Sequence, residues 1–184
     1  MRYVCFLRAI NVGGRYVTMT ELKKIFVKMG LDNVETFIAS GNVIFDSTRK
    51  PEQLEKLISS KLRESLGYEV ASFVRTIPEL RAVAEHQPFD AEAHERAIGY
   101  TVAFTTKAIT KEQNARLAAY CTEFDEFTSR GSEIYWICRG RQSDSQFANA
   151  KMEKNLGTSA TWRGINTVRR LVAKYAGSHH SKKS

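Results

Sequence analysis

The sequence predicts an α+β protein built from two similar halves, each an antiparallel sheet with helices on one face. Short β-branched or aromatic segments alternate with segments of helical periodicity, and the order of these segments repeats once along the 184 residues. Gly41 and Gly131 are separated by the same number of residues as Gly67 and Gly157. The repeated order and the constant spacing indicate an internal duplication.

In the first half, residues 2–8 are predicted as a strand because they are apolar and stop just before a Gly–Gly pair. Pro51 is placed at the favoured first position of a helix, and Gly67 ends that helix. The predicted elements of this half are strand 2–8, helix 20–29, strands 33–39 and 43–46, helix 51–66, strand 70–75 and helix 78–86.

The second half repeats this plan, with Thr110 as the expected cap of its first helix. Its predicted elements are strand 98–105, helix 110–120, strands 124–129 and 133–138, helix 145–156, strand 159–163 and helix 166–175. The order β-α-β-β-α-β plus a helix is typical of the ferredoxin-like arrangement. The predicted organisation is a first half at 1–88, a linker at 89–97, a second half at 98–176 and a disordered tail at 177–184.

The formal net charge of +8 favours anionic partners, although an ordinary solvated basic surface explains it equally well. Cys5, Cys121 and Cys138 are unclustered, which fits a reducing cytoplasm, and they suggest neither a disulfide framework nor a metal. No apolar stretch approaches the ~20 residues of a transmembrane helix. We therefore expect a cytoplasmic protein with no membrane contact, metal or cofactor, and the oligomeric state stays open.

The most unusual local chemistry is the stretch that follows the first strand, Leu7-Arg8-Ala9-Ile10-Asn11-Val12-Gly13-Gly14-Arg15. Glycines there let backbone N–H groups approach a phosphate, and the following helix start adds partial positive charge. The candidate ligand-binding residues of this loop are Arg8, Asn11, Gly13, Gly14 and Arg15. The loop is longer than its counterpart in the second half, which favours a site over a structural need. A plain flexible turn is the alternative, because the loop matches no specific nucleotide-binding motif.

Two further stretches of the sequence are candidates for ligand binding. The turn Ser40-Gly41-Asn42 contributes Ser40, Gly41 and Asn42 if it adjoins the Gly–Gly loop, and otherwise it is an ordinary hairpin turn. A basic stretch late in the second half forms a possible second anion site, with Arg139 and Arg141 nearby in sequence. Asn166 or Thr167 can instead be a helix cap. The candidate residues of this second site are Lys151, Lys154, Arg163, Asn166 and Thr167.

The sequence contains no catalytic triad, carboxylate pair or metal cluster, and His86 and His94 have no identifiable partner. Whether the protein is an enzyme stays open. The repeated βαββαβ order and positive charge suggest comparison with RNA-recognition domains, which stack bases on aromatic residues of central strands. The third strands lack the expected basic-Gly-aromatic pattern, so we interpret the strand aromatics as core.

The residues Leu7 to Gly14, Met19 and Ser40 to Val43 resemble the N-terminal signature of a bacterial family known as domain of unknown function 1697. Lys151, Leu156-Gly157, Thr161-x-Arg163 and Asn166-Thr167 are similar to its C-terminal signature. The resemblance spans roughly residues 1–175 and implies two ferredoxin-like halves without an established activity. The leading hypothesis is binding of, or an unknown reaction on, an anionic ligand that carries phosphate or a nucleotide. The alternatives are nucleic-acid binding and a protein interaction module.

Overall fold

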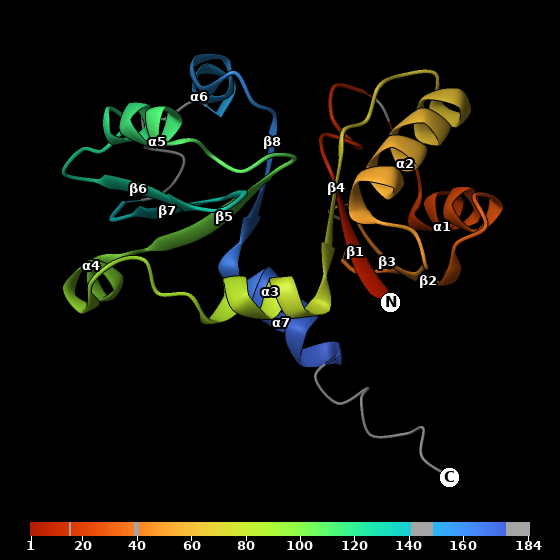
Figure 1. The fold of residues 1–184 in the computed structure, drawn as a ribbon, viewed down its shortest axis with the longest axis horizontal. Coiled ribbons are helices and arrows are strands. Elements are labelled where there is room, and N and C mark those ends of the chain that lie inside the picture. The colour runs from red at the N-terminus through yellow and green to blue at the C-terminus, as the bar shows by residue number, and fades with distance from the viewer. Residues whose placement is uncertain (15, 39–40, 141–148, 176–184) are drawn as a thin grey trace, which may run out of the picture. The chain divides into compact units, whose positions relative to one another are not determined.

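The chain folds into two units, Met1–Arg81 and Ala82–Ser184. The structure is a computed structural model that describes residues 1–14, 16–38, 41–140 and 149–175. Figure 1 labels its helices and strands. Each unit contains one four-stranded antiparallel sheet, so the expectation of an α+β protein with two similar halves is confirmed.

The first unit has the sheet order β2-β3-β1-β4. Its first helix begins with a capping box, in which Thr18 Oγ accepts from the Glu21 N–H and the Glu21 carboxylate accepts from the Thr18 N–H. The helix α3, Ile77–Glu85, follows the last strand of this unit and continues into the second unit, which begins at Ala82. The other elements are β1 (Arg2–Leu7), α1 (Met19–Lys28), β2 (Asp32–Thr36), β3 (Asn42–Asp46), α2 (Pro51–Leu66) and β4 (Ser72–Thr76).

Alternation along the strands decides which side chains meet α1 and α2. Cys5 of β1 lies opposite Val43 on β3 and opposite Val74 on β4 in the antiparallel sheet. All three side chains belong to the buried cluster beneath these helices. Leu22 and Phe26 of α1 and Leu54, Ile58 and Leu62 of α2 complete the cluster. The helical periodicity of the sequence therefore corresponds to one apolar face on each helix.

The second unit has the equivalent sheet order β6-β7-β5-β8. Thr110 caps its first full helix as the sequence predicts, because its side chain accepts from the Gln113 N–H. The elements are α4 (Ala91–Arg96), β5 (Gly99–Thr105), α5 (Lys111–Ala118), β6 (Asp125–Arg130), β7 (Glu133–Cys138), α6 (Asn149–Leu156), β8 (Ala160–Gly164) and α7 (Ile165–Tyr175).

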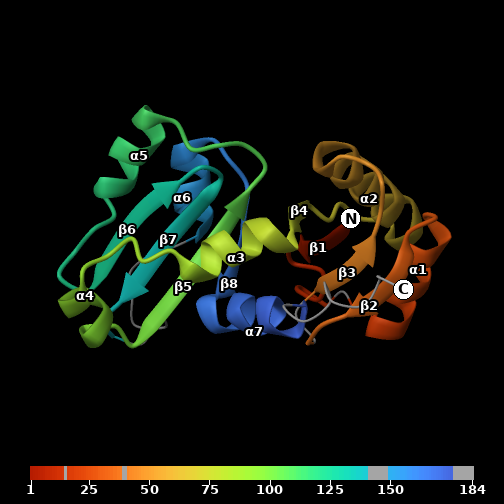
Figure 2. The same ribbon diagram turned by 60° about the horizontal axis from the view of Figure 1, so that its bottom comes forward.

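Helices cover both faces of the second sheet, which corrects the expectation of helices on one face. Ala103, Ile134 and Trp136 point toward α5 and α6, in one cluster with Met152 and Leu156. Figures 1 and 2 show α4 and α7 on the opposite side of this sheet. The segment 89–97, expected to be a linker, contains α4, and His94 on α4 packs against Tyr100 with ring centroids 5.3 Å apart.

The hairpin strands of the two units are offset by one residue from the constant spacing seen in the sequence. Gly67 follows α2 and Gly157 follows α6, with φ angles of +77° and +63°. Val43 pairs with Cys5, and Ile134 pairs with Ala103, and all four face the helices. Ile134 therefore corresponds to Val43 and not to Ile44, the match that constant spacing predicts. The cap Thr110 likewise corresponds to Thr18, where the sequence pattern suggests Thr20.

Candidate functional site

The loop between β1 and α1 is closed at its base by one side chain. Asn11 Oδ1 accepts from the Val17 N–H at 2.8 Å, and Asn11 Nδ2 donates to the Val17 carbonyl at 3.2 Å. The carbonyl of the buried Ile10 accepts from the Tyr68 hydroxyl at 2.9 Å, which attaches the loop to the α2–β4 connection. The base of the loop is thus held in one conformation by hydrogen bonds and by burial of Ile10 and Val17.

The tip of the loop projects from this clamp. Val12 is 63% exposed and Tyr16 is 80% exposed. Gly13 and Gly14 have φ angles of +69° and +79°, and no atom lies within 4 Å of a Cβ built on either. Glycine is therefore required here by the backbone conformation and not by lack of space.

The tip offers hydrogen-bond donors to a ligand. Within the described part of the chain, the backbone N–H groups of Gly13 and Gly14 have no protein acceptor. Arg8, at the end of β1, is half-buried, and its own N–H donates to the Ala71 carbonyl at 2.9 Å. Two exposed glycine amides next to each other are suited to an anion.

The hairpin turn between β2 and β3 lies against the base of the loop. The Gly41 carbonyl accepts from the Leu7 N–H at 2.8 Å, and a Cβ on Gly41 would lie 2.9 Å from Ile10 Cγ2. The two N-terminal stretches that the sequence singled out are therefore neighbours in the first unit. Ile38, in the same turn, is a 43% exposed apolar residue with a φ angle of +52°.

Three predicted ligand-binding residues, Asn42, Gly41 and Asn11, make structural contacts. Asn42 is fully buried, and its Nδ2 donates to the Phe37 carbonyl at 3.0 Å, so its amide holds the turn. Gly41 is buried as well and provides the close approach to Ile10. The amide of Asn11 is used by the clamp. These three positions shape the loop and the turn, while the amides of Gly13 and Gly14 remain exposed.

The first turn of α1 carries a negative charge of its own, on Glu21. The Glu21 carboxylate already accepts from the Thr18 N–H at 3.0 Å and from the Thr18 hydroxyl at 2.7 Å. These bonds hold the pKa of Glu21 below its ordinary value, so this carboxylate is charged at neutral pH. A negative charge at the first turn offsets the helix dipole, and an anion would rely on the glycine amides and arginines of the loop.

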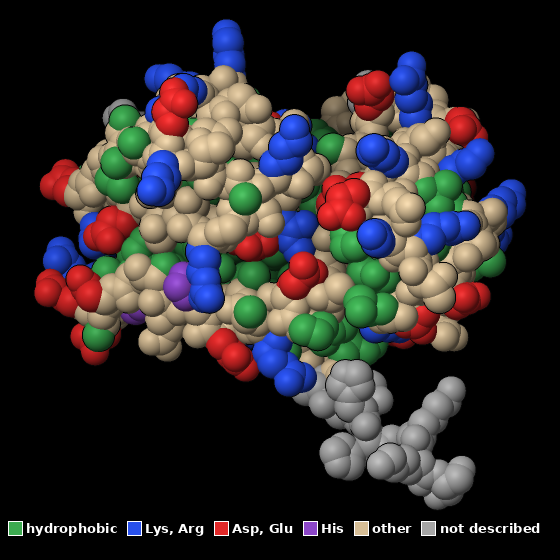
Figure 3. Space-filling model, in the orientation of Figure 1, with side chains coloured by type: hydrophobic (Ala, Val, Ile, Leu, Met, Phe, Trp, Pro, Cys, Tyr) green, Lys and Arg blue, Asp and Glu red, His purple; other side chains and the backbone are tan. Residues whose placement is uncertain are grey.

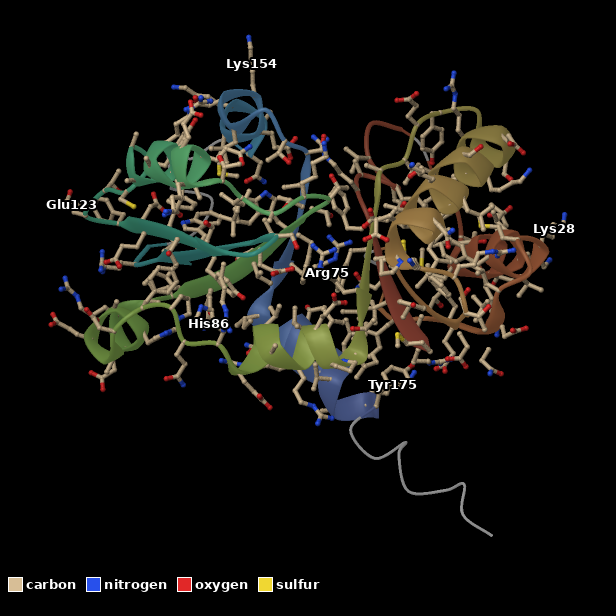
Figure 4. The ribbon with its side chains drawn as sticks, in the orientation of Figure 1. Lys28, Arg75, His86, Glu123, Lys154 and Tyr175 are labelled. Atoms are coloured by element: carbon tan, nitrogen blue, oxygen red, sulfur yellow. The ribbon has the colours of Figure 1, made fainter. Side chains whose placement is uncertain are left out.

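The basic stretch of the second unit is divided between the two faces of the sheet. Lys151 and Lys154 are exposed on α6, and Figure 4 shows Lys154 pointing away from the sheet. Arg163 follows Trp162 on β8, and Trp162 packs toward α6, so alternation directs Arg163 to the opposite face. Its Nη1 donates to Thr161 Oγ1 at 2.9 Å and to the Trp162 carbonyl at 2.7 Å.

The other residues of this stretch follow Arg163 onto α7. This helix begins at Ile165, so Asn166 and Thr167 lie in its first turn and neither is the residue before it. Asn166 is exposed and accepts from Arg169 at 3.4 Å. Arg139 is paired with Glu126 and donates to the Glu123 carbonyl. Among the described residues of this unit, Lys151 and Lys154 on α6 and Arg163 on β8 therefore lie on opposite faces of the sheet.

Three predicted positions, Arg15, Ser40 and Arg141, and the tail 177–184 lie outside the described residues. Sequence reasoning missed Tyr68 and Val17, which fix the loop. The capping box was readable as the pattern Thr18-x-x-Glu21, whereas the Tyr68–Ile10 contact joins residues far apart in the chain and left no local signal.

A shallow depression of about 240 Å³ on the first unit contains none of the predicted site residues. It is lined by Met1, Gly30, Asp32, Asp46, Ser47, Thr48 and Arg49. In the described ranges, no group of three His, Cys, Asp or Glu side chains is arranged to hold a metal ion. No helix in these ranges is both long and apolar enough to cross a membrane.

The fold and the first-unit loop define a class of α+β protein with two units. In its first unit the β1–α1 connection and the β2–β3 turn lie in contact. The chain belongs to the protein family of unknown function DUF1697, whose model matches residues 1–135. The loop and the turn lie within the matched region, and the basic stretch from Lys151 to Thr167 lies beyond it.

The chain is similar in fold to solved structures that include the conserved bacterial protein SP0830 from Streptococcus pneumoniae. The similarity has a TM-score of 0.72 at 23% sequence identity and covers 94% of this chain and 97% of that one. No protein of curated function matches the chain significantly. These similarities support the fold and the family.

Proposed function

We propose that the first unit binds an anionic ligand that carries a phosphate group, either a nucleotide or a small phosphorylated molecule, at the tip of the loop after β1. The observation that carries the proposal is the pair of exposed, unbonded N–H groups of Gly13 and Gly14 on a loop clamped by Asn11. Because the clamp fixes the loop before a ligand arrives, little ordering entropy opposes binding.

Charge and an aromatic ring support the same ligand class. Arg8 and Arg15 flank the loop in sequence, and the chain has a net charge of +8. The Tyr16 ring is 80% exposed, two residues after Gly14, and an exposed aromatic ring is suited to stacking on a nucleobase. A nucleotide would use both the amides and the ring, whereas inorganic phosphate would use the amides alone.

The test is a titration of the protein with inorganic phosphate and with nucleoside monophosphates, followed by the amide NMR signals of Gly13 and Gly14. We expect both signals to shift, and Arg8→Gln and Arg15→Gln each to weaken binding about tenfold through loss of one charge-assisted bond. Arg49→Gln is the charge-matched control, since Arg49 is exposed in the same unit and distant from the loop in sequence. No shift of either glycine signal with any probe would refute the proposal.

A protein interaction module is the second candidate, and one specific observation favours it. Val12, Tyr16 and Ile38 are exposed apolar side chains on the loop and the adjoining turn. If they bind a protein, replacing Val12 and Tyr16 by Ser should abolish the complex and leave phosphate binding unchanged. Direct nucleic-acid binding is less favoured, because Lys and Arg alternate with Asp and Glu over the described surface of each unit drawn in Figure 3.

We also infer that each unit is a ferredoxin-like half and that the two arose by internal duplication, with halves at 1–88 and 98–176. The equivalent strand orders support this. The free cysteines Cys5, Cys121 and Cys138 support a reducing, cytoplasmic location.

A further inference from the structure

His86 is held against the second sheet by residues from three strands. Its backbone carbonyl accepts from the Tyr100 hydroxyl on β5 at 3.3 Å. Arg130 of β6 places Nη1 3.2 Å from its Nδ1, and the Tyr135 ring of β7 lies edge-on with centroids 5.0 Å apart. Figure 4 shows His86 on the side of this sheet opposite α5 and α6. The orientation of the imidazole is therefore determined by its surroundings.

The contact with Arg130 decides which imidazole nitrogen carries the proton. A guanidinium only donates, so Nδ1 must accept and the hydrogen of the neutral ring is on Nε2. Burial and the Arg130 charge lower the pKa of His86 below its ordinary value, which keeps the ring neutral at pH 7. Across the described ranges, Nε2–H has no acceptor, so it is available to a ligand.

Tyr135 beside it is an unusual buried residue. Its side chain is 1% exposed, yet its hydroxyl has no hydrogen-bond partner anywhere in the described part of the chain. The hydroxyl oxygen is not among the fully enclosed side-chain atoms that lack a partner, so it reaches the surface, where a ligand or solvent can accept from it. Burial raises the pKa of Tyr135, and the hydroxyl therefore stays protonated and able to donate.

The neighbouring acid restricts the charge of that acceptor. Glu133 lies on the same strand face as Tyr135, and its charge also raises the Tyr135 pKa. Its carboxylate lies 3.4 Å from Ser132 Oγ, at the β6–β7 turn. Arg130 supplies one positive charge against this negative one. Glu133 repels any anion at this position, and it repels a phosphate dianion about twice as strongly as a singly charged carboxylate.

We propose that the second unit binds a small organic molecule through its carboxylate, with Arg130, the Nε2–H of His86 and the hydroxyl of Tyr135 as donors. The apolar body of that molecule would lie near the cluster of Phe89, His94 and Tyr100, whose rings pack edge-on at 5.3 to 6.1 Å. The site is independent of the phosphate site proposed for the first unit and differs from it in the anion it takes.

The experiment titrates the full-length protein with acetate and, separately, with inorganic phosphate, and follows the Nε2 signal of His86 by NMR. The signal is assigned from its loss in His86→Asn. We expect acetate to shift it at lower concentration than phosphate does. Tyr135→Phe and Arg130→Gln should each weaken acetate binding about tenfold. Arg96→Gln, an exposed arginine on α4, is the charge-matched control and should leave binding unchanged.

Tyr135→Phe is also a control for folding. Because the hydroxyl has no partner in the described residues, its removal should leave the melting temperature at or above that of the wild type. Absence of an acetate shift at His86, equal affinity of the wild type and Tyr135→Phe, or tighter binding of phosphate than of acetate would each overturn the proposal.

Discussion

Gly41 provides the sharpest test of how the loops of the first unit fit together, through the substitution Gly41→Ala. Its φ angle of +71° costs an L-residue about 1–2 kcal/mol. The new Cβ would lie 2.9 Å from Ile10 Cγ2 and 3.3 Å from Leu7 Cβ. Both neighbours are at most 4% exposed and have little room to move, so overpacking adds about 1–3 kcal/mol. We expect a total destabilisation of roughly 2–5 kcal/mol.

Gly13→Ala is the matched control, because Gly13 has nearly the same φ angle, +69°, with no atom within 4 Å of the added Cβ. This substitution should lower the free energy of unfolding by only about 1–2 kcal/mol, the strain of an L-residue at this φ angle. Both tryptophans, Trp136 and Trp162, are in the second unit, so amide hydrogen exchange of β1 in urea is a better measurement than fluorescence. If Gly41→Ala destabilises β1 no more than Gly13→Ala does, the close approach to Ile10 is refuted.

Three further predictions follow from the contacts above. Asn11→Ala removes both hydrogen bonds to Val17 and should cost about 1–3 kcal/mol and speed amide exchange at Val17; unchanged exchange would contradict the clamp. Burial raises the pKa of Glu55 above 4.5, so the folded state holds this proton more tightly than the unfolded state does. The free energy of unfolding should fall as pH rises from about 4.5 through the raised pKa, and Glu55→Gln should remove that part of the slope in urea titrations; an unchanged slope would contradict it. Cys121 is the exposed cysteine and should react with a thiol reagent in the native protein, while the two buried cysteines react only on unfolding.

The element order could be predicted because its signals are local. Pro51 and Gly67 bound α2, and Thr110 caps α5, where the sequence places them. Each of these residues acts on the backbone within a few positions of itself, so a single sequence is enough to recognise it. The same reasoning explains the success of the family resemblance in the first unit, whose signature residues determine local loop and turn geometry.

The strand register could not be predicted in the same way. A one-residue shift in a strand reverses the face of every side chain, and apolar residues on both faces of a buried strand hide the difference. Ile44 and Val43 are both fully buried, so hydrophobicity alone does not show that Val43 faces the helices. Glycine spacing located the turns, but the number of residues between turn and strand differs between the units.

The candidate sites were harder to predict from the sequence than the strand register, because the contacts that define them join residues far apart in the chain. The partnerless hydroxyl of Tyr135 is meaningful only beside His86, which comes from a different part of the unit. Asn42 and Gly13 look equally suited to a ligand in the sequence, yet one is buried and the other exposed. Exposure and partners, which depend on the tertiary structure, separate residues that support a site from those that face a ligand.

Comparison of the two β–α connections explains why the loop after β1 remains the leading functional candidate. In the second unit the Thr105 N–H donates to the Ser132 carbonyl at 2.9 Å, the Ile109 N–H donates to the Gly131 carbonyl at 2.7 Å, and α5 follows immediately. The first unit makes the equivalent bond from Leu7 to Gly41, but its connection then extends over residues 8–18 before α1 begins. The short connection shows that a strand and a helix can be joined in this fold without the extra residues. Since those residues are nevertheless clamped and expose two glycine amides, we infer that they act on a molecule outside the unit.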